Sequence, residues 1–343
     1  MKTSLEELAA EKGVLLADGA IGTNLFKAGL ETGYPPELWN VERPEAITAL
    51  YLQFIDAGSD IILTNSFGGT SFRLKLHQNE TRVAELNLAA AALARQVVDA
   101  AARPVLVAGS IGPTGELFAP LGMLTDIDAE AAFSEQAGAL AKGGVDMLWI
   151  ETMSSLEEVR AAAIAAKKTG LPVMATMTFD TAGRSMMGIK PGDYSDFAAE
   201  IELQGFGANC GIGPAELIDS VSYFDSRQQD RFVIAKGNCG IPAYVDGEIH
   251  YHGTPELMAE YAVIARDLGV RIIGGCCGTS PEHIRAMRTA LDSVQKSSPP
   301  SKEEIEKRLG VAWKDLQHAP SANSPADGRD RRRRRTGRNR PAS

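Results

Sequence analysis

The feature that most constrains the fold of this chain is a strict alternation of short apolar runs with longer amphipathic stretches between residues 14 and 292. In the stretches between the runs, apolar residues recur at three- and four-residue spacing, which is typical of helices that bury one face. Eight apolar runs alternating with about eight helices predict an α/β protein with a single parallel sheet closed into a (β/α)8 TIM barrel. The eight expected strands cover residues 14–20, 60–67, 104–112, 146–153, 171–179, 205–211, 232–240 and 270–278. An open doubly wound sheet is less favoured, because no GxGxxG motif follows the first run.

The composition divides the chain into two parts. Residues 297–343 hold twelve Lys or Arg and six Asp or Glu, a net charge of +6, so the remaining residues 1–296 carry −15. We expect 1–296 to form the barrel and the Pro-, Ser- and Arg-rich segment 297–343 to be a disordered, flexible tail that cannot bury a core. An acidic body argues against nucleic acid as the partner, since phosphate binding needs a basic surface.

Several other classes of protein are also disfavoured. Apolar runs stay well below the ~18 residues that a membrane-spanning helix needs, so no membrane partner is expected. The first residues are polar and acidic, unlike an export signal. Four cysteines in 343 residues are too few for a secreted disulfide framework. The chain is therefore expected to be a cytoplasmic enzyme.

Reactive side chains gather where the expected strands end. In a (β/α)8 barrel the carboxyl ends of the strands form one mouth, where catalytic groups sit. Asp18 and Gly19 end the first strand, Glu151 the fourth, and Asn209 the sixth. All four cysteines, Cys210, Cys239, Cys276 and Cys277, also fall at strand ends. We expect these groups to meet at the mouth.

The adjacent pair Cys276 and Cys277 suggests a metal site. Neighbouring residues of a strand point to opposite faces, so both thiols can reach one metal only if the backbone turns, which the flanking glycines permit. A third thiolate, from Cys210 or Cys239, would leave the fourth position of a tetrahedral zinc open, as in catalytic sites. Small buried cysteines or a redox pair of vicinal thiols are the alternatives. Asp18 and Glu151 suit either an ammonium group or acid–base work, although Asp18 could also simply cap a helix.

The motifs LLADGAIGTNL, TNSFGG, ETM, GANCG and IIGGCCGTSPEHIRAM together resemble the homocysteine S-methyltransferase family over residues 12–292, with greatest similarity to its bacterial betaine-dependent members. The resemblance implies that Cys210, Cys276 and Cys277 bind Zn²⁺ and that Cys239 does not. It also implies that Asp18 and Glu151 hold the amino group of homocysteine, with Gly19 and Asn209 beside them at the substrate. Zinc would then favour the thiolate of homocysteine, whose unperturbed pKa is ~8.5, and the thiolate would take a methyl group from betaine to give methionine and dimethylglycine.

Recognition of betaine requires aromatic faces around its trimethylammonium group. Trp39, in the long segment 24–42, and Phe67 are the principal candidates, ahead of Phe26 and Tyr244. Backbone amides of the glycine turns at 68–69 and 112–115 are candidates for its carboxylate. The animal betaine enzymes carry aromatic residues where this chain has Thr152 and Gly68, so the donor pocket is expected to differ from theirs.

Other functions stay open on the sequence alone. The donor could be S-methylmethionine, another methylsulfonium or a separate methyl-corrinoid protein. A function of another class is a non-catalytic or redox barrel that binds zinc. A homo-oligomer is possible.

Overall fold

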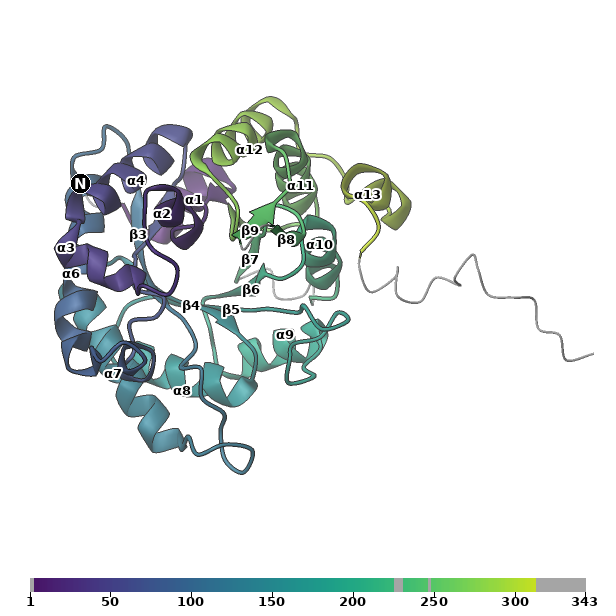
Figure 1. Cartoon of the computed structure of the whole chain (residues 1–343). Coiled ribbons are helices and arrows are strands. Elements are labelled where there is room, and N and C mark those ends of the chain that lie inside the picture. The colour runs from purple at the N-terminus through teal and green to yellow at the C-terminus, as the bar shows by residue number, and fades with distance from the viewer. Residues whose placement is uncertain (1–2, 225–230, 246–247, 313–343) are drawn as a thin grey trace, which may run out of the picture.

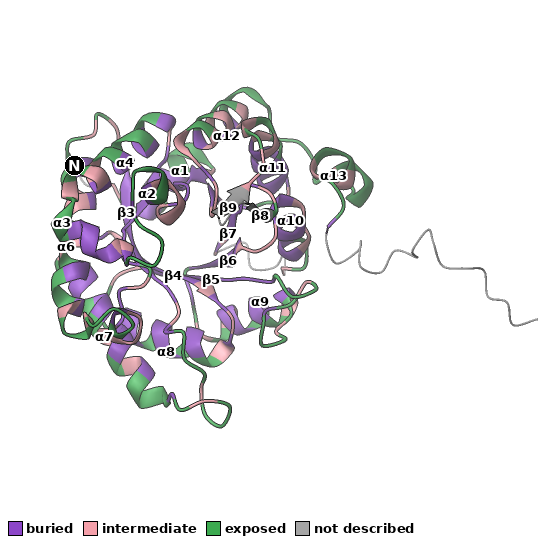
Figure 2. Ribbon diagram, in the orientation of Figure 1, coloured by how far each residue is buried: buried purple, intermediate pink, exposed green. Residues whose placement is uncertain are grey.

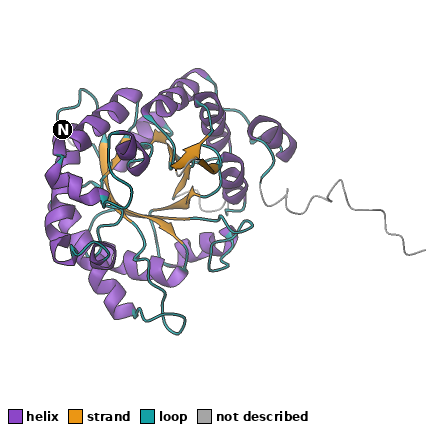
Figure 3. Ribbon diagram, viewed as in Figure 1, coloured by secondary structure: helices purple, strands orange, loops and turns teal. Residues whose placement is uncertain are grey.

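The barrel expected from the sequence is present in the computed structural model, which describes residues 3–224, 231–245 and 248–312. Eight parallel strands form one sheet in the order β1-β10-β7-β6-β5-β4-β3-β2. A parallel bridge between Ala17 and Ile61 joins β1 to β2 and closes the ring (Figures 1 and 3). The strands are β1 Leu15–Leu16, β2 Ile61–Leu63, β3 Leu106–Ile111, β4 Met147–Met153, β5 Val173–Met177, β6 Gly205–Cys210, β7 Phe232–Gly237 and β10 Ile272–Gly275.

Helices surround the strands, and short polar side chains start several of them. Thr125, Ser155 and Thr254 accept the backbone amide three residues along, which satisfies a donor that has no partner inside the helix. The helices are α1 Leu5–Lys12, α2 Gly22–Lys27, α3 Trp39–Glu42, α4 Pro44–Ala57, α5 Ser71–Lys75, α6 Val83–Asp99, α7 Asp126–Lys142, α8 Leu156–Lys167, α9 Pro191–Glu200, α10 Pro214–Ser222, α11 Pro255–Asp267, α12 Pro281–Ser293 and α13 Lys302–Leu309, with 3-10 turns η1 Pro36–Leu38 and η2 Glu80–Arg82.

The strands are buried on both faces, so the core has two layers (Figure 2). Leu15, Ile61 and Trp149 belong to a cluster that fills the barrel interior. Leu16 and Ile62, one residue further along their strands, pack in the larger cluster between sheet and helices. This alternation follows from the two-residue period of a strand and explains the continuous apolar runs of the sequence.

Three segments have more structure than the sequence suggests. The long segment 24–42, for which the sequence predicts no regular element, includes most of α2 and all of η1 and α3. After β7, strands β8 Pro242–Val245 and β9 Glu248–Tyr251 form an antiparallel hairpin. Helix α13 falls within the expected tail but contacts α10 and α11, and Ile305 and Leu309 pack against the core. Within the described residues, no helix is both long and apolar enough to cross a membrane.

Candidate active site at the carboxyl ends of the strands

Three of the four cysteines meet at the mouth of the barrel. Cys210 ends β6, and Cys276 and Cys277 directly follow β10. The Sγ atom of Cys210 lies 3.8 Å from that of Cys277 and 3.5 Å from that of Cys276. Over the described ranges, this is the single cluster of three or more His, Cys, Asp or Glu side chains that could hold a metal ion.

Backbone turns at both strand ends bring these thiols together. Cys210 has a left-handed backbone with φ of 64°, and the next residue, Gly211, continues it at 78°. Gly278 has φ of 80° directly after Cys277. Asn238 links the two turns, because its side-chain amide donates to Gly211 O and its Oδ1 accepts the Cys277 amide at 3.0 Å. A non-glycine residue in this region costs of order 1 kcal/mol or more, and such strain concentrates at functional sites.

Hydrogen bonds among the three thiols move their pKa values apart. Hydrogen bonds from Cys210 and Cys276 lower the pKa of Cys277 to about 3. The hydrogen bond with Cys210 lowers the pKa of Cys276, but the bond with Cys277 and burial outweigh it and raise the pKa to about 11. Hydrogen bonds with Cys276 and Cys277 raise the pKa of Cys210 well above its ordinary value. Of the three thiols, Cys277 therefore loses its proton most readily.

Cys239 stands apart from the cluster. Its Sγ donates to Gly253 O at 3.1 Å, and burial raises its pKa to about 11. Its backbone amide donates to Cys277 O at 2.9 Å, so it supports the turn without offering its sulfur.

The two predicted carboxylates differ in their surroundings. Glu151 lines the mouth pocket, and its Oε1 accepts the Ser110 hydroxyl at 2.5 Å. Burial raises the pKa of Glu151 to about 7, although Lys236 opposes the rise. Asp18 is fully buried and does not line the pocket: its Oδ2 accepts the Leu63 amide at 2.8 Å, and its Oδ1 lies 3.3 Å from Lys236 Nζ. The ammonium next to Asp18 thus belongs to the protein itself.

A pocket of about 470 Å³ opens above the thiols. Its floor contains the three cysteines, Glu151, Ser110 and Lys236, and its outer wall comes from α2, the segment before α3 and the turn after β2. The outer wall presents partly exposed rings and two basic groups: Phe26, Tyr34, Phe67, Arg73 and His77. A polar, thiol-rich floor under an aromatic rim suits a small, partly charged substrate.

The other predicted site residues divide between pocket and core. Gly19 and Phe67 line the pocket as expected. Trp39 does not: it is 5% exposed in the main core, with the Arg43 guanidinium 4.6 Å from its ring centroid, so the expectation that it faces the methyl donor is corrected. Asn209 is fully buried, and both ends of its side-chain amide bind Thr152. Its Oδ1 accepts the Thr152 amide at 2.8 Å, and its Nδ2 donates to the Thr152 hydroxyl at 2.7 Å. The side chain of Tyr244 lies outside the described residues.

Sequence reasoning missed Lys236, Ser110 and Arg73. A signal for Lys236 was available in the run FVIAKG, because a lysine inside a buried strand needs an anionic partner. Ser110 stands at the end of the third strand, where position alone does not separate it from other small strand-end residues. Arg73 lies on a short helix that apolar periodicity does not mark.

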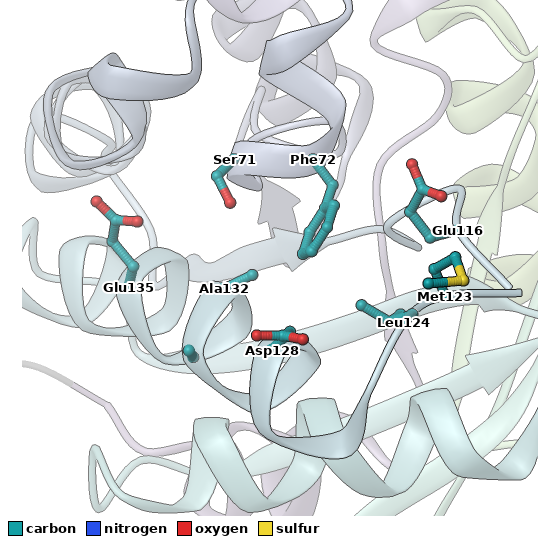
Figure 4. A pocket seen from close by; sticks show the side chains of 9 residues that line it. Ser71, Phe72, Glu116, Met123, Leu124, Asp128, Ala132 and Glu135 are labelled. Carbon is teal, nitrogen blue, oxygen red and sulfur yellow. The ribbon is translucent and has the colours of Figure 1, made fainter. Parts of the chain in front are cut away.

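A second hollow lies on the outside of the barrel between α5 and α7 (Figure 4). Glu116, Asp128 and Glu135 give it an acidic lining, and Phe72 and Met123 give it an apolar one. It contains no thiol and shares no residue with the mouth pocket. The chemistry therefore points to the mouth.

Comparisons with known proteins agree with this geometry. The family model described as homocysteine S-methyltransferase matches residues 15–291. The methionine synthases of Mycobacterium tuberculosis (strain ATCC 25618 / H37Rv) and Mycobacterium leprae (strain TN) are 29% and 28% identical over 86% and 87% of this chain. The chain spans about a quarter of their length, 26% in each case. The metallated homocysteine methyltransferase MmuM from Escherichia coli has a similar fold, with a TM-score of 0.68 and 23% identity over 83% of this chain and 99% of that one.

Proposed function

Because the chain belongs to the homocysteine S-methyltransferase family, we propose that it transfers a methyl group from betaine to the sulfur of homocysteine, giving methionine and dimethylglycine. The observation that carries this proposal is the meeting of three thiols and Glu151 on the floor of one pocket whose rim is aromatic. Floor and rim offer separate places for a thiol substrate and an onium donor.

The thiol cluster fits Zn²⁺. Tetrahedral zinc with sulfur ligands at ~2.3 Å places the sulfur atoms roughly 3.8 Å apart. The separations of Cys210 Sγ from the other two sulfur atoms, 3.8 and 3.5 Å, are close to this value. Cys210, Cys276 and Cys277 would hold the ion, and the relative from Escherichia coli is described in a metallated form. When bound, Zn²⁺ acts as a Lewis acid that favours the thiolate form of a substrate thiol at neutral pH.

Glu151 is the group best placed to bind the ammonium of homocysteine. It lines the pocket beside Cys276, whereas Asp18 lies behind Lys236. Ser110 holds one carboxylate oxygen of Glu151 and leaves the other for the substrate. Asp18 is assigned a positioning role, since it fixes the Lys236 ammonium, which also contacts Gly19 O at 3.3 Å.

The rim supports a methylated cation. Phe26, Tyr34 and Phe67 are 46%, 37% and 38% exposed in a pocket where a trimethylammonium group could lie against their faces. Displacement of a methyl group by a thiolate needs alignment more than proton transfer, so holding donor and acceptor in one pocket supplies the main catalytic effect.

The named relatives favour a second candidate donor. The chain is similar to two methionine synthases, so a methyl-corrinoid donor is the alternative within the same family. S-methylmethionine is a third donor for comparison, because it is also a methylated onium compound.

A donor panel separates these possibilities. Purified full-length protein is incubated with homocysteine and, in turn, betaine, S-methylmethionine and methylcobalamin, and methionine is measured. We expect turnover with betaine. Preference for either other donor would refute betaine and leave the homocysteine assignment standing.

Metal analysis tests the thiol cluster. Cys277→Ala is expected to lose bound zinc and activity, while Cys239→Ala, the matched control at the neighbouring strand end, keeps both. Full zinc content in Cys277→Ala would refute the proposed ligand set.

A further inference from the structure

One cationic side chain of the mouth pocket has no partner in the chemistry described above. Arg73 lies on α5, is half-buried and lines the outer part of the pocket. Its guanidinium makes no hydrogen bond or ion pair with the residues that the structure describes. Glu37, a buried acid on the same rim, accepts the Gly68 amide through its Oε1 at 2.6 Å. Burial raises the pKa of Glu37, and the charges of Arg73 and His77 partly oppose the rise without a hydrogen bond.

The other groups near this pocket that could bind an anion are already occupied, except His77. His77 also lines the rim, but a guanidinium is charged at every working pH and can hold a carboxylate through two parallel hydrogen bonds. The Gly69 amide donates to Ser66 O and the Gly112 amide to Phe67 O, each at 3.0 Å. The Thr114 amide donates to Glu158 at 2.8 Å. These bonds, with that of Gly68, occupy both amides of the 68–69 turn and the Gly112 and Thr114 amides of the 112–115 turn, so the expectation that the glycine turns offer free amides to a carboxylate is corrected at these four positions. Lys236, the cation on the floor, is paired with Asp18.

The chain leaves space for the guanidinium on the pocket wall. Gly115 has φ of 84°, and a Cβ at this position would lie 3.1 Å from Arg73 Nη1. A side chain there would crowd the guanidinium as well as strain the backbone. Glycine at 115 therefore lets Arg73 lie against the 112–115 turn with its fork free.

We propose that Arg73 binds the carboxylate of the methyl donor, so that the pocket selects a zwitterionic onium compound with its methylated cation toward the thiols and its carboxylate at the rim. This inference rests on the proposed function and refines its donor class. Guanidinium matches a carboxylate with two parallel hydrogen bonds. A donor with a positive charge and no carboxylate would instead add a cation to a pocket whose rim already holds the Arg73 guanidinium.

The test compares betaine with betaine methyl ester, which keeps the trimethylammonium group and loses the negative charge. For Arg73→Gln we expect kcat/KM with betaine to fall about tenfold or more, as for loss of a charge-assisted hydrogen bond. With the ester, kcat/KM of the variant should stay within about twofold of wild type, because the ester has no carboxylate with which Arg73 could form that hydrogen bond. The homocysteine KM and zinc content should not change. Arg73→Lys keeps the charge but not the two parallel donors, so its kcat/KM with betaine should lie between those of wild type and Arg73→Gln.

Lys75→Gln is the matched control, because Lys75 lies on the same helix, is exposed and does not line the pocket. It should retain the wild-type preference for betaine over the ester. Arg73→Met keeps the aliphatic stem and replaces Arg73→Gln if the latter folds poorly by circular dichroism. An unchanged preference in the Arg73 variants overturns the inference.

Failure of the proposed donor gives a different result. If wild type uses S-methylmethionine and not betaine, the betaine proposal is wrong, and the same variants are compared on S-methylmethionine and its methyl ester. Loss of the carboxylate preference then supports Arg73 as the anchor, and its retention refutes it. Wild type that works only with methylcobalamin overturns both proposals.

Discussion

At the residue scale, buried polar side chains hold the reactive groups in place. Asn209 joins β4 to β6 through two hydrogen bonds with Thr152, whose own φ of 63° lies in the left-handed region. Its Nδ2 also lies 3.9 Å from Cys276 Sγ. One side-chain amide thus links the ends of β4 and β6, where Thr152 and Cys210 have left-handed backbones, and lies near Cys276 after β10. A buried polar network of this kind costs free energy when a partner is removed.

Glu151 should make homocysteine binding dependent on pH. With its pKa at about 7, the carboxylate that binds an ammonium is lost as the pH falls through 7. We expect kcat/KM for homocysteine, at saturating betaine, to decline from about pH 8 to about pH 6.

Glu151→Gln should lack this acidic decline and have a kcat/KM for homocysteine about tenfold lower at pH 8, for loss of a charge-assisted hydrogen bond. Any dependence that comes from the substrate thiol should remain in the variant. An identical acidic decline in wild type and Glu151→Gln would show that another group titrates.

At the element scale, the sequence predicts the strands well and the mouth partly. The period of the apolar runs places all eight barrel strands, and the strand-end rule brings Cys210 to Cys276 and Cys277. The period of the apolar runs does not say in which direction a side chain points once the strand has ended and the chain turns. That is why Trp39 was expected at the rim but packs in the core, and why Lys236 and Arg73 emerged only from the structure.

The turn at 112–115 depends on an acid from a neighbouring helix. Glu158, on α8, is buried and its Oε1 accepts both the amide and the hydroxyl of Thr114, at 2.8 and 2.7 Å. Glu158→Ala would leave both donors without this partner, and we expect the free energy of unfolding in urea to fall by ~1–3 kcal/mol. Because the turn contacts Phe67 and Arg73, the donor KM should rise while the homocysteine KM stays the same.

Glu157→Ala is the control, since Glu157 is exposed on the same helical turn. Its effect on stability should stay within ~0.5 kcal/mol. Equal effects of the two substitutions on the donor KM would argue against a link between the turn and the donor.

At the scale of the whole molecule, the barrel mouth and the C-terminal segment are separate. No residue of 297–312 lines the mouth pocket, and α13 lies on the outer side of the ring against α10 and α11 (Figure 1). Arg308 pairs with Glu260 at 2.5 Å, and Ser297 bonds to Asp267. Residues 313–343, which include the arginine run 331–335, lie outside the described residues. The chain associated with the barrel therefore extends beyond the expected boundary at 296.

Two truncations distinguish the contributions of these segments. Deleting 313–343 should change neither Tm nor turnover, because a Pro-, Ser- and Arg-rich composition cannot bury a core. Deleting 298–343 also removes α13 and leaves Leu257 without Leu309 and Val311, the residues that line an apolar groove with it. Burial of such side chains is worth ~1.5–3 kcal/mol each at most, so we expect Tm to fall by several degrees. Turnover below Tm should remain, since the mouth keeps all its residues. Loss of activity in a folded 298–343 deletion would show instead that the C-terminal segment contributes to the site or to assembly.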